Sequence, residues 1–122
     1  MKRDLDPIRL LLIKVEGVEK VDLSRYTADA IKYHQALLID GGLVEGKAPY
    51  SSRGGPQSEE IPARVYIKRL TWEGHEFLDK AQNNLTWEKA KQFVKEKGLS
   101  LSAEALKIAL SIVIKQGLKP GP

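Results

Sequence analysis

Cysteine is absent from this chain of 122 residues. Its absence excludes disulfide bridges, zinc–thiolate centres and cysteine nucleophiles, and it agrees with a reducing compartment such as the cytoplasm. Histidine is also scarce: only His34 and His75 occur, with no cysteine to accompany them. The sequence therefore predicts no transition-metal site.

Long apolar runs are missing as well. No run approaches the ~20 residues that cross a bilayer, and the N-terminus, Met1–Asp6, continues into an amphipathic pattern without the apolar core of a signal peptide. We therefore expect a cytoplasmic protein without membrane contact.

No phosphate-binding glycine loop occurs, because Gly54–Gly55 does not stand between a strand and a helix. The acidic residues form no converging pair for acid–base catalysis, so we expect neither an enzyme nor a cofactor.

The chain carries a net charge of +4, with a pI near 9.3. Residues 47–69 hold five basic and two acidic residues, and residues 86–122 hold seven lysines and three glutamates. The differences are +3 and +4, so the remaining residues are slightly negative. This basicity permits contact with nucleic acid without requiring it. Lysines in the second region fit a solvated helix better than a phosphate site.

Two helices are expected in the first third of the chain. Asp6 is expected to cap the first, with Pro7 at its first position, and Gly17 to end it. Thr27 is expected to cap a second helix that continues to about Asp40. The pair Gly41–Gly42 then predicts a left-handed C-terminal turn.

A hairpin is expected next. Residues 43–47 predict one strand, and residues 48–60 have the composition of a loop. Apolar residues alternate with polar ones over 61–69, which predicts a half-buried strand with Arg64 and Lys68 on its outer face. The two strands are expected to pair antiparallel and form a long wing.

Three more helices are expected after the hairpin. Thr71 is expected to cap a helix over 72–82, Thr86 a helix ending at Gly98, and Ser102 a last helix ending at Gly117. Gly74 lies inside the first of these and costs about 1 kcal/mol relative to alanine. A close approach of that helix to neighbouring backbone would explain the glycine. Trp72 and Trp87, at helix starts, are interpreted as core anchors.

Two segments carry a family resemblance. The block Tyr33–Val44 resembles the end of the recognition helix of bacterial winged-helix regulators, and Leu70–Gly74 resembles the helix start that follows their wing. In three further features the chain resembles, over roughly residues 1 to 95, small bacterial and prophage proteins catalogued as a domain of unknown function. These features are the opening Met1–Asp6, the pair Tyr33–His34 and the longer motif Leu70–Leu78. The resemblance implies a winged-helix fold and carries no established activity.

We therefore predict an α+β protein with a winged helix-turn-helix-like domain over 1–85, with a long wing, and a helical extension over 86–122. The helix-turn-helix is reduced, because the segment from Gly17 to Tyr26 leaves room for at most one turn before the second helix. Either the helix that should stand there is vestigial, or residues 6–16 serve in its place. That shortage argues against standard docking in the major groove.

The leading functional hypothesis is a DNA-binding regulatory or accessory protein that contacts the phosphates of double-stranded DNA mainly through its wing. Exposed cations on an edge hairpin also serve solubility, and Gln35 fits a solvated side chain better than an adenine contact. The alternatives are a non-enzymatic module that binds an unidentified protein and, less favoured, a small enzyme without a visible site. The candidate nucleic-acid contacts are Arg25, Lys32, Gln35, Lys47, Arg53, Arg64 and Lys68.

The last helix has a narrow polar stripe, whereas a surface helix usually has an apolar stripe only somewhat wider than ~100°. It should therefore be buried on two sides, either within its own domain or against a second copy of the chain. For a homodimer, the expected interface residues are Leu106, Leu110 and Val113, while the row that contains Ile108 and Ile112 would face the chain's own core.

His34, on an apolar helix face, is interpreted as a core histidine whose hydrogen bonds are satisfied, and His75 is interpreted as a surface residue.

Overall fold

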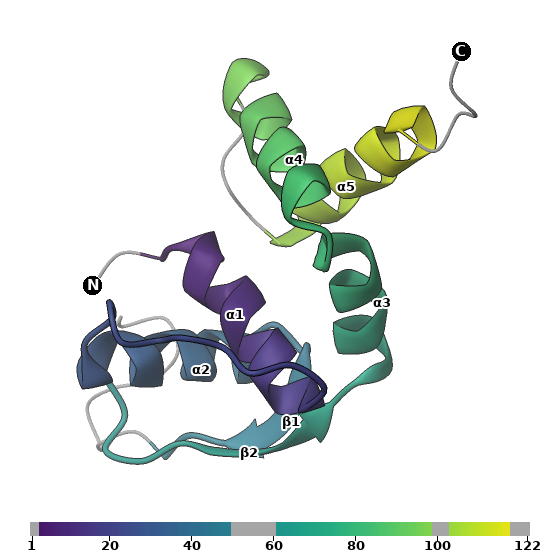
Figure 1. The fold of residues 1–122 in the computed structure, drawn as a ribbon. Coiled ribbons are helices and arrows are strands. Elements are labelled where there is room, and N and C mark those ends of the chain that lie inside the picture. Colours follow the sequence, from purple (N-terminus) through teal and green to yellow (C-terminus); the bar gives the residue numbers. More distant parts are fainter. Residues whose placement is uncertain (1–2, 50–60, 99–102, 118–122) are drawn as a thin grey trace. The chain divides into compact units, whose positions relative to one another are not determined.

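The computed structural model describes residues 3–49, 61–98 and 103–117. In these ranges the chain forms five helices and one two-stranded antiparallel sheet, which makes it an α+β protein (Figure 1). It divides into two compact units, Met1–His75 and Glu76–Pro122. The elements are α1 (Leu5–Glu16), α2 (Ala28–Asp40), β1 (Val44–Lys47), β2 (Tyr66–Leu70), α3 (Trp72–Ala81), α4 (Asn84–Glu96) and α5 (Ala103–Gly117).

Helix α1 begins two residues earlier than its capping pattern predicted. Asp4, not Asp6, is the N-cap: it is extended, and its carboxylate accepts the backbone N–H of Asp6 at 3.1 Å. Pro7 still lies in the first turn, where no intrahelical donor is lost. The earlier start brings Leu5 into the buried row of α1. The helix ends at Gly17, which is left-handed with φ 80°.

Helix α2 has the predicted boundaries. The Thr27 hydroxyl caps it by accepting the N–H of Ala30 at 3.0 Å. At the other end, Gly42 adopts the left-handed conformation with φ 72°, and the N–H of Leu43 donates to the carbonyl of Leu38 at 3.0 Å. This closing turn satisfies a free carbonyl of the last turn and leads the chain directly into β1. Between α1 and α2 the chain makes only one turn, Tyr26 N–H to Leu23 O, as the shortness of the segment predicted.

Strands β1 and β2 pair antiparallel as predicted, but the second strand is shorter than expected. It begins at Tyr66, so assigning residues 61–65 to a strand was wrong. Proline cannot donate to a strand ladder, and Pro62 is buried instead. The neighbouring carbonyl of Ala63 accepts a bond from the Lys32 ammonium at 3.3 Å, where a strand would have used a backbone N–H.

A bulge interrupts the hairpin. Glu45 pairs with Arg69 and Gly46 with Ile67, so Lys68 is one extra residue in β2. A bulge reorients the side chains that follow it. Here Leu70 and Val44 are buried on the inner face, whereas Tyr66, Lys68 and Arg69 are all exposed.

Helix α3 starts against the beginning of β1. The Thr71 hydroxyl accepts the N–H of Gly74 at 3.0 Å, and the Thr71 N–H donates to the carbonyl of Leu43 at 3.1 Å. A Cβ at Gly74 would fall onto that same Leu43 carbonyl oxygen. The predicted reason for a glycine inside this helix, close approach to neighbouring backbone, is therefore confirmed. The order of α2, hairpin and α3 is compatible with a winged-helix arrangement.

The second unit is built from the end of α3 and the pair α4 and α5, which pack side by side (Figure 1). Asn83, not Thr86, is the N-cap of α4, because its side chain accepts the N–H of Thr86 at 3.0 Å. The Phe77 and Trp87 rings meet edge to face, with centroids 6.2 Å apart. This contact helps explain why the units divide within α3, earlier than the expected boundary after residue 85.

Candidate nucleic-acid interface

The outer face of the hairpin gathers three exposed side chains around one groove. Lys47 lies opposite Tyr66 in the ladder, and Lys68 follows two residues later along β2. All three are exposed, and they share one face because Lys47 pairs with Tyr66 and because Tyr66 and Lys68 are two residues apart on one strand. The groove has a volume of about 500 Å³ and is lined by Gly46, Lys47, Tyr66, Ile67 and Lys68.

Charge on this face is not uniform. The Arg69 guanidinium donates to Glu45 at 2.9 Å across the two strands, so this arginine is neutralised locally. Both side chains are well exposed, and such a pair contributes roughly 0–1 kcal/mol to stability. Lys47 and Lys68 form no ion pair with any residue that the structure describes. Within the two strands, the cations without an ionic partner among the described residues are therefore these two lysines.

The remaining candidate contacts are more dispersed. Arg64 is exposed just before β2, and Lys32 lies beside it through its bond to the Ala63 carbonyl. Arg25 is exposed before α2, with its guanidinium 5.4 Å from the centre of the Tyr26 ring. Gln35 is half-buried on α2. Arg53 lies outside the described residues.

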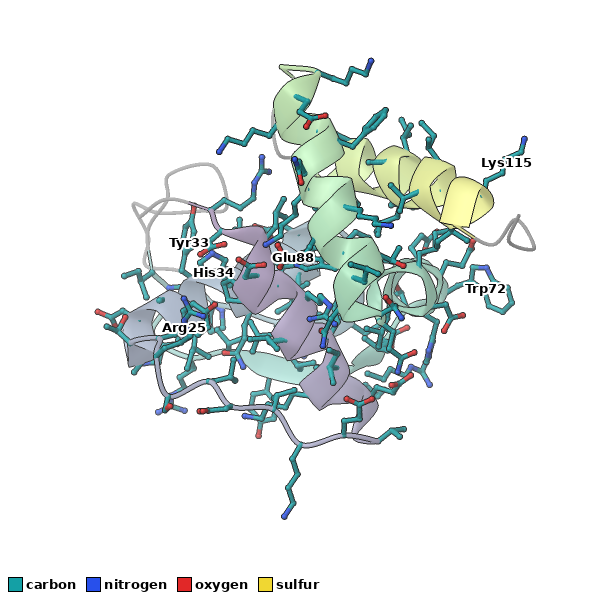
Figure 2. The ribbon with its side chains drawn as sticks, turned by 45° about the horizontal axis from the view of Figure 1, so that its top comes forward. Arg25, Tyr33, His34, Trp72, Glu88 and Lys115 are labelled. Atoms are coloured by element: carbon teal, nitrogen blue, oxygen red, sulfur yellow. The ribbon has the colours of Figure 1, made fainter. Side chains whose placement is uncertain are left out.

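His34 is a structural residue of the core, as its place on the apolar face of α2 indicated. It is only 2% exposed. Its Nδ1 lies 2.7 Å from the carbonyl of Ala30, and its Nε2 accepts the backbone N–H of Asp4 at 2.8 Å. This arrangement requires the neutral tautomer that carries its proton on Nδ1. Figure 2 shows His34 next to Tyr33, whose ring meets the imidazole edge to face at 5.1 Å.

The two tryptophans differ in a way that the sequence did not predict. Trp87 is 2% exposed and is a core anchor as expected, but Trp72 is 77% exposed, so its interpretation as an anchor was wrong. Figure 2 shows the Trp72 side chain extending away from the ribbon. The adjacent cap explains the difference, because Thr71 and Gly74 take the positions against β1 and turn residue 72 outward.

In helix α5, the apolar row that is buried in the chain's own core is not the row that was expected there. Leu106 and Leu110 are fully buried in the single chain, and Val113 is partly covered. Ile108, expected to face the chain's own core, is 60% exposed, and Ile112 is partly covered. Leu106 and Leu110 are therefore core residues, which corrects their assignment to a dimer interface.

Two carboxylates outside the hairpin have shifted pKa values. The pKa of Asp22 is lowered by bonds from the side chain and the backbone N–H of Ser24, the latter at 2.9 Å. The pKa of Asp40, the last residue of α2, is raised by partial burial.

Within the described residues, no three histidine or acidic side chains gather as a metal site would need. None of the described helices combines the length and apolar character of a membrane span.

Sequence reasoning identified the cations of the hairpin but passed over Tyr66. The signal was present, since Tyr66 occupies the same outward alternation as Arg64 and Lys68. The pairing of Tyr66 with Lys47 was not predictable, because the bulge at Lys68 sets the register between the strands and no glycine or proline marks it at residue 68.

Comparison with known proteins agrees with the resemblance seen in the motifs. Residues 2–100 match the model of a family of hypothetical proteins, DUF2513. An uncharacterised protein of Haemophilus influenzae is 34% identical over 125 residues, which cover 97% of this chain and 99% of that protein. No solved structure matches the chain. On the family match and this relative, the chain belongs to the DUF2513 family of hypothetical proteins.

Proposed function

We propose that this protein is a non-enzymatic, cytoplasmic DNA-binding regulatory or accessory protein, of bacterial or prophage origin, that contacts phosphates through the outer face of its hairpin. The observation that carries the proposal is the placement of Lys47 and Lys68 on one exposed face without ionic partners among the described residues. Exposed Arg64 extends the same basic surface. Lysine and arginine on such a surface bind the phosphate backbone whatever the sequence.

The arrangement of the helices favours the hairpin over α2 as the contact surface. The only basic residue on the outward face of α2 is Lys32, which is held by the Ala63 carbonyl and stands near the exposed Asp29. The segment between α1 and α2 contains one turn and no helix, so the helix before α2 is α1, and the link between them is longer than the short turn of a standard helix-turn-helix. Contacts through the wing therefore account for the charge pattern better.

The test is a titration of random-sequence duplex DNA at two salt concentrations. The wild-type protein should bind at low salt, and binding should weaken as salt rises, because released counterions drive the association. Replacing Arg64 and Lys68 by alanine should weaken binding and reduce the salt slope by about one unit per lost phosphate contact. A matched control replaces Lys89 and Lys95, two exposed lysines of α4, and should leave both quantities unchanged. Absence of wild-type binding at low salt, or an unaffected hairpin variant, would refute the proposal.

The second candidate function is a non-enzymatic protein-interaction module, for dimerisation or as an adaptor, on the same scaffold. Among the exposed large apolar side chains, two favour it: Trp72 in the first unit and Ile108 in the second. Exposed tryptophan is enriched at the centres of protein interfaces. If DNA binding fails, concentration-dependent light scattering of the wild-type chain, compared with Trp72→Ala and Ile108→Lys separately, tests whether either side chain lies in a homodimer interface.

A further inference from the structure

Among the large apolar residues of the first unit, Tyr66 has a distinctive setting. Three of them are exposed in the described residues: Val18, Tyr66 and Trp72. Tyr66, at 75% exposure, lines the hairpin groove with Lys47 opposite it in the ladder and Lys68 two residues further along its strand. Neither Val18 nor Trp72 lines this groove. An exposed aromatic ring that shares a groove with two cations suits a flat, anionic ligand.

One of the residues that line the groove is a glycine. Gly46 pairs with Ile67 next to the bulge, and a Cβ there would collide with the carbonyl oxygen of Tyr66. The position therefore carries no side chain, and Gly46 contributes only backbone to the groove, whereas Lys47 lies directly opposite Tyr66. The volume of about 500 Å³ falls within the ~300–1,000 Å³ typical of ligand sites.

We propose that Tyr66 stacks on an unpaired base of a nucleic-acid strand whose phosphates lie against Lys47 and Lys68. Basic grooves with exposed aromatic rings bind single strands in this way, because every base offers a π-face and the phosphates follow the cations. In a fully paired duplex the faces of the bases are covered by their neighbours, so the ring gains nothing there. The site should therefore prefer DNA with unpaired bases. This inference rests on the proposed function and specifies its substrate class.

The experiment compares an oligothymidylate single strand with a random-sequence duplex of equal length, by fluorescence anisotropy at low salt. Stacking is worth about 1–3 kcal/mol per base, which converts to a loss of roughly 5- to 150-fold when the ring is removed. Tyr66→Ala should lose that affinity for the single strand and little for the duplex. Tyr66→Phe keeps the ring and should bind like the wild type. Because the side chain is exposed, both variants should unfold at the wild-type temperature.

Two further variants separate the possible failures. Trp72→Ala removes an equally exposed ring outside the groove and should leave single-strand binding unchanged; an equal loss would refute the assignment to Tyr66. Lys68→Ala should weaken binding to both oligonucleotides. If Lys68→Ala weakens duplex binding while Tyr66→Ala affects neither oligonucleotide, the stacking inference fails and the proposed function stands. If the wild type binds neither, both fail.

Discussion

Replacing Gly74 by alanine should destabilise the protein, although the same change in an ordinary helix interior stabilises by about 1 kcal/mol. The reason is the position of the Leu43 carbonyl, on which the new methyl group would fall. That carbonyl also accepts the Thr71 N–H at 3.1 Å, so it cannot move away without weakening the junction between β1 and α3.

The size of the effect follows from these two contacts. Forcing an extra carbon into a packed position costs about 1–3 kcal/mol, and a weakened backbone hydrogen bond adds roughly 0.5–1.5 kcal/mol. Subtracting the gain of about 1 kcal/mol in helix propensity leaves a net loss of about 0.5–3.5 kcal/mol in the free energy of unfolding. Urea denaturation followed by circular dichroism measures this loss.

A neighbouring substitution provides the control. His75 is exposed on the same helix, so His75→Ala should be neutral or slightly stabilising through helix propensity alone. Amide exchange at Thr71 gives a local readout, since Gly74→Ala should accelerate it and His75→Ala should not. If Gly74→Ala raises the unfolding free energy by about 1 kcal/mol, as at an open helix position, the close approach to Leu43 is refuted.

Three other predictions concern the core, a helix end and α5. His34→Leu leaves the Asp4 N–H without its acceptor and should cost about 1–3 kcal/mol, measured by urea denaturation; a variant as stable as the wild type would contradict the structural role of this imidazole. Burial raises the pKa of Asp40 in the folded state, so the contribution of this carboxyl group to stability is greatest below its ordinary pKa of 3.8 and is lost as pH rises through the folded-state pKa. Asp40→Asn should therefore be more stable than the wild type at pH 7 and should lose that advantage at pH 3. Thermal melts at both pH values measure the difference. Leu110→Lys should unfold the second unit, because Leu110 is fully buried, whereas Ile108→Lys should fold normally, as circular dichroism can show; equal tolerance of both would refute the observed burial of α5.

Several features were predictable because they depend on residues close together in the chain. The Thr27 and Thr71 caps each need only a hydroxyl three residues before an N–H. The left-handed end of α2 needs only a glycine at residue 42. The outward direction of Lys68 was predictable from alternation. These determinants are local, so the sequence alone indicated the order of the elements and the cations of the hairpin.

Other features were decided by contacts between distant segments. The start of β2 depends on a bond from Lys32 to the carbonyl of Ala63, 31 residues away, and on the burial of Pro62. The inward row of α5 depends on how that helix packs in the second unit, since both of its apolar rows are suitable for burial.

Periodicity measures how apolar a face is and does not identify its neighbour. For that reason the sequence established that α5 has two apolar rows and that the hairpin is basic. Only the tertiary structure decided that Leu106 and Leu110 belong to the core, that Trp72 is exposed, and that Tyr66 shares a groove with two lysines. Each of these outcomes depends on which surfaces meet when the chain folds, and that choice is made by packing between segments far apart in the sequence.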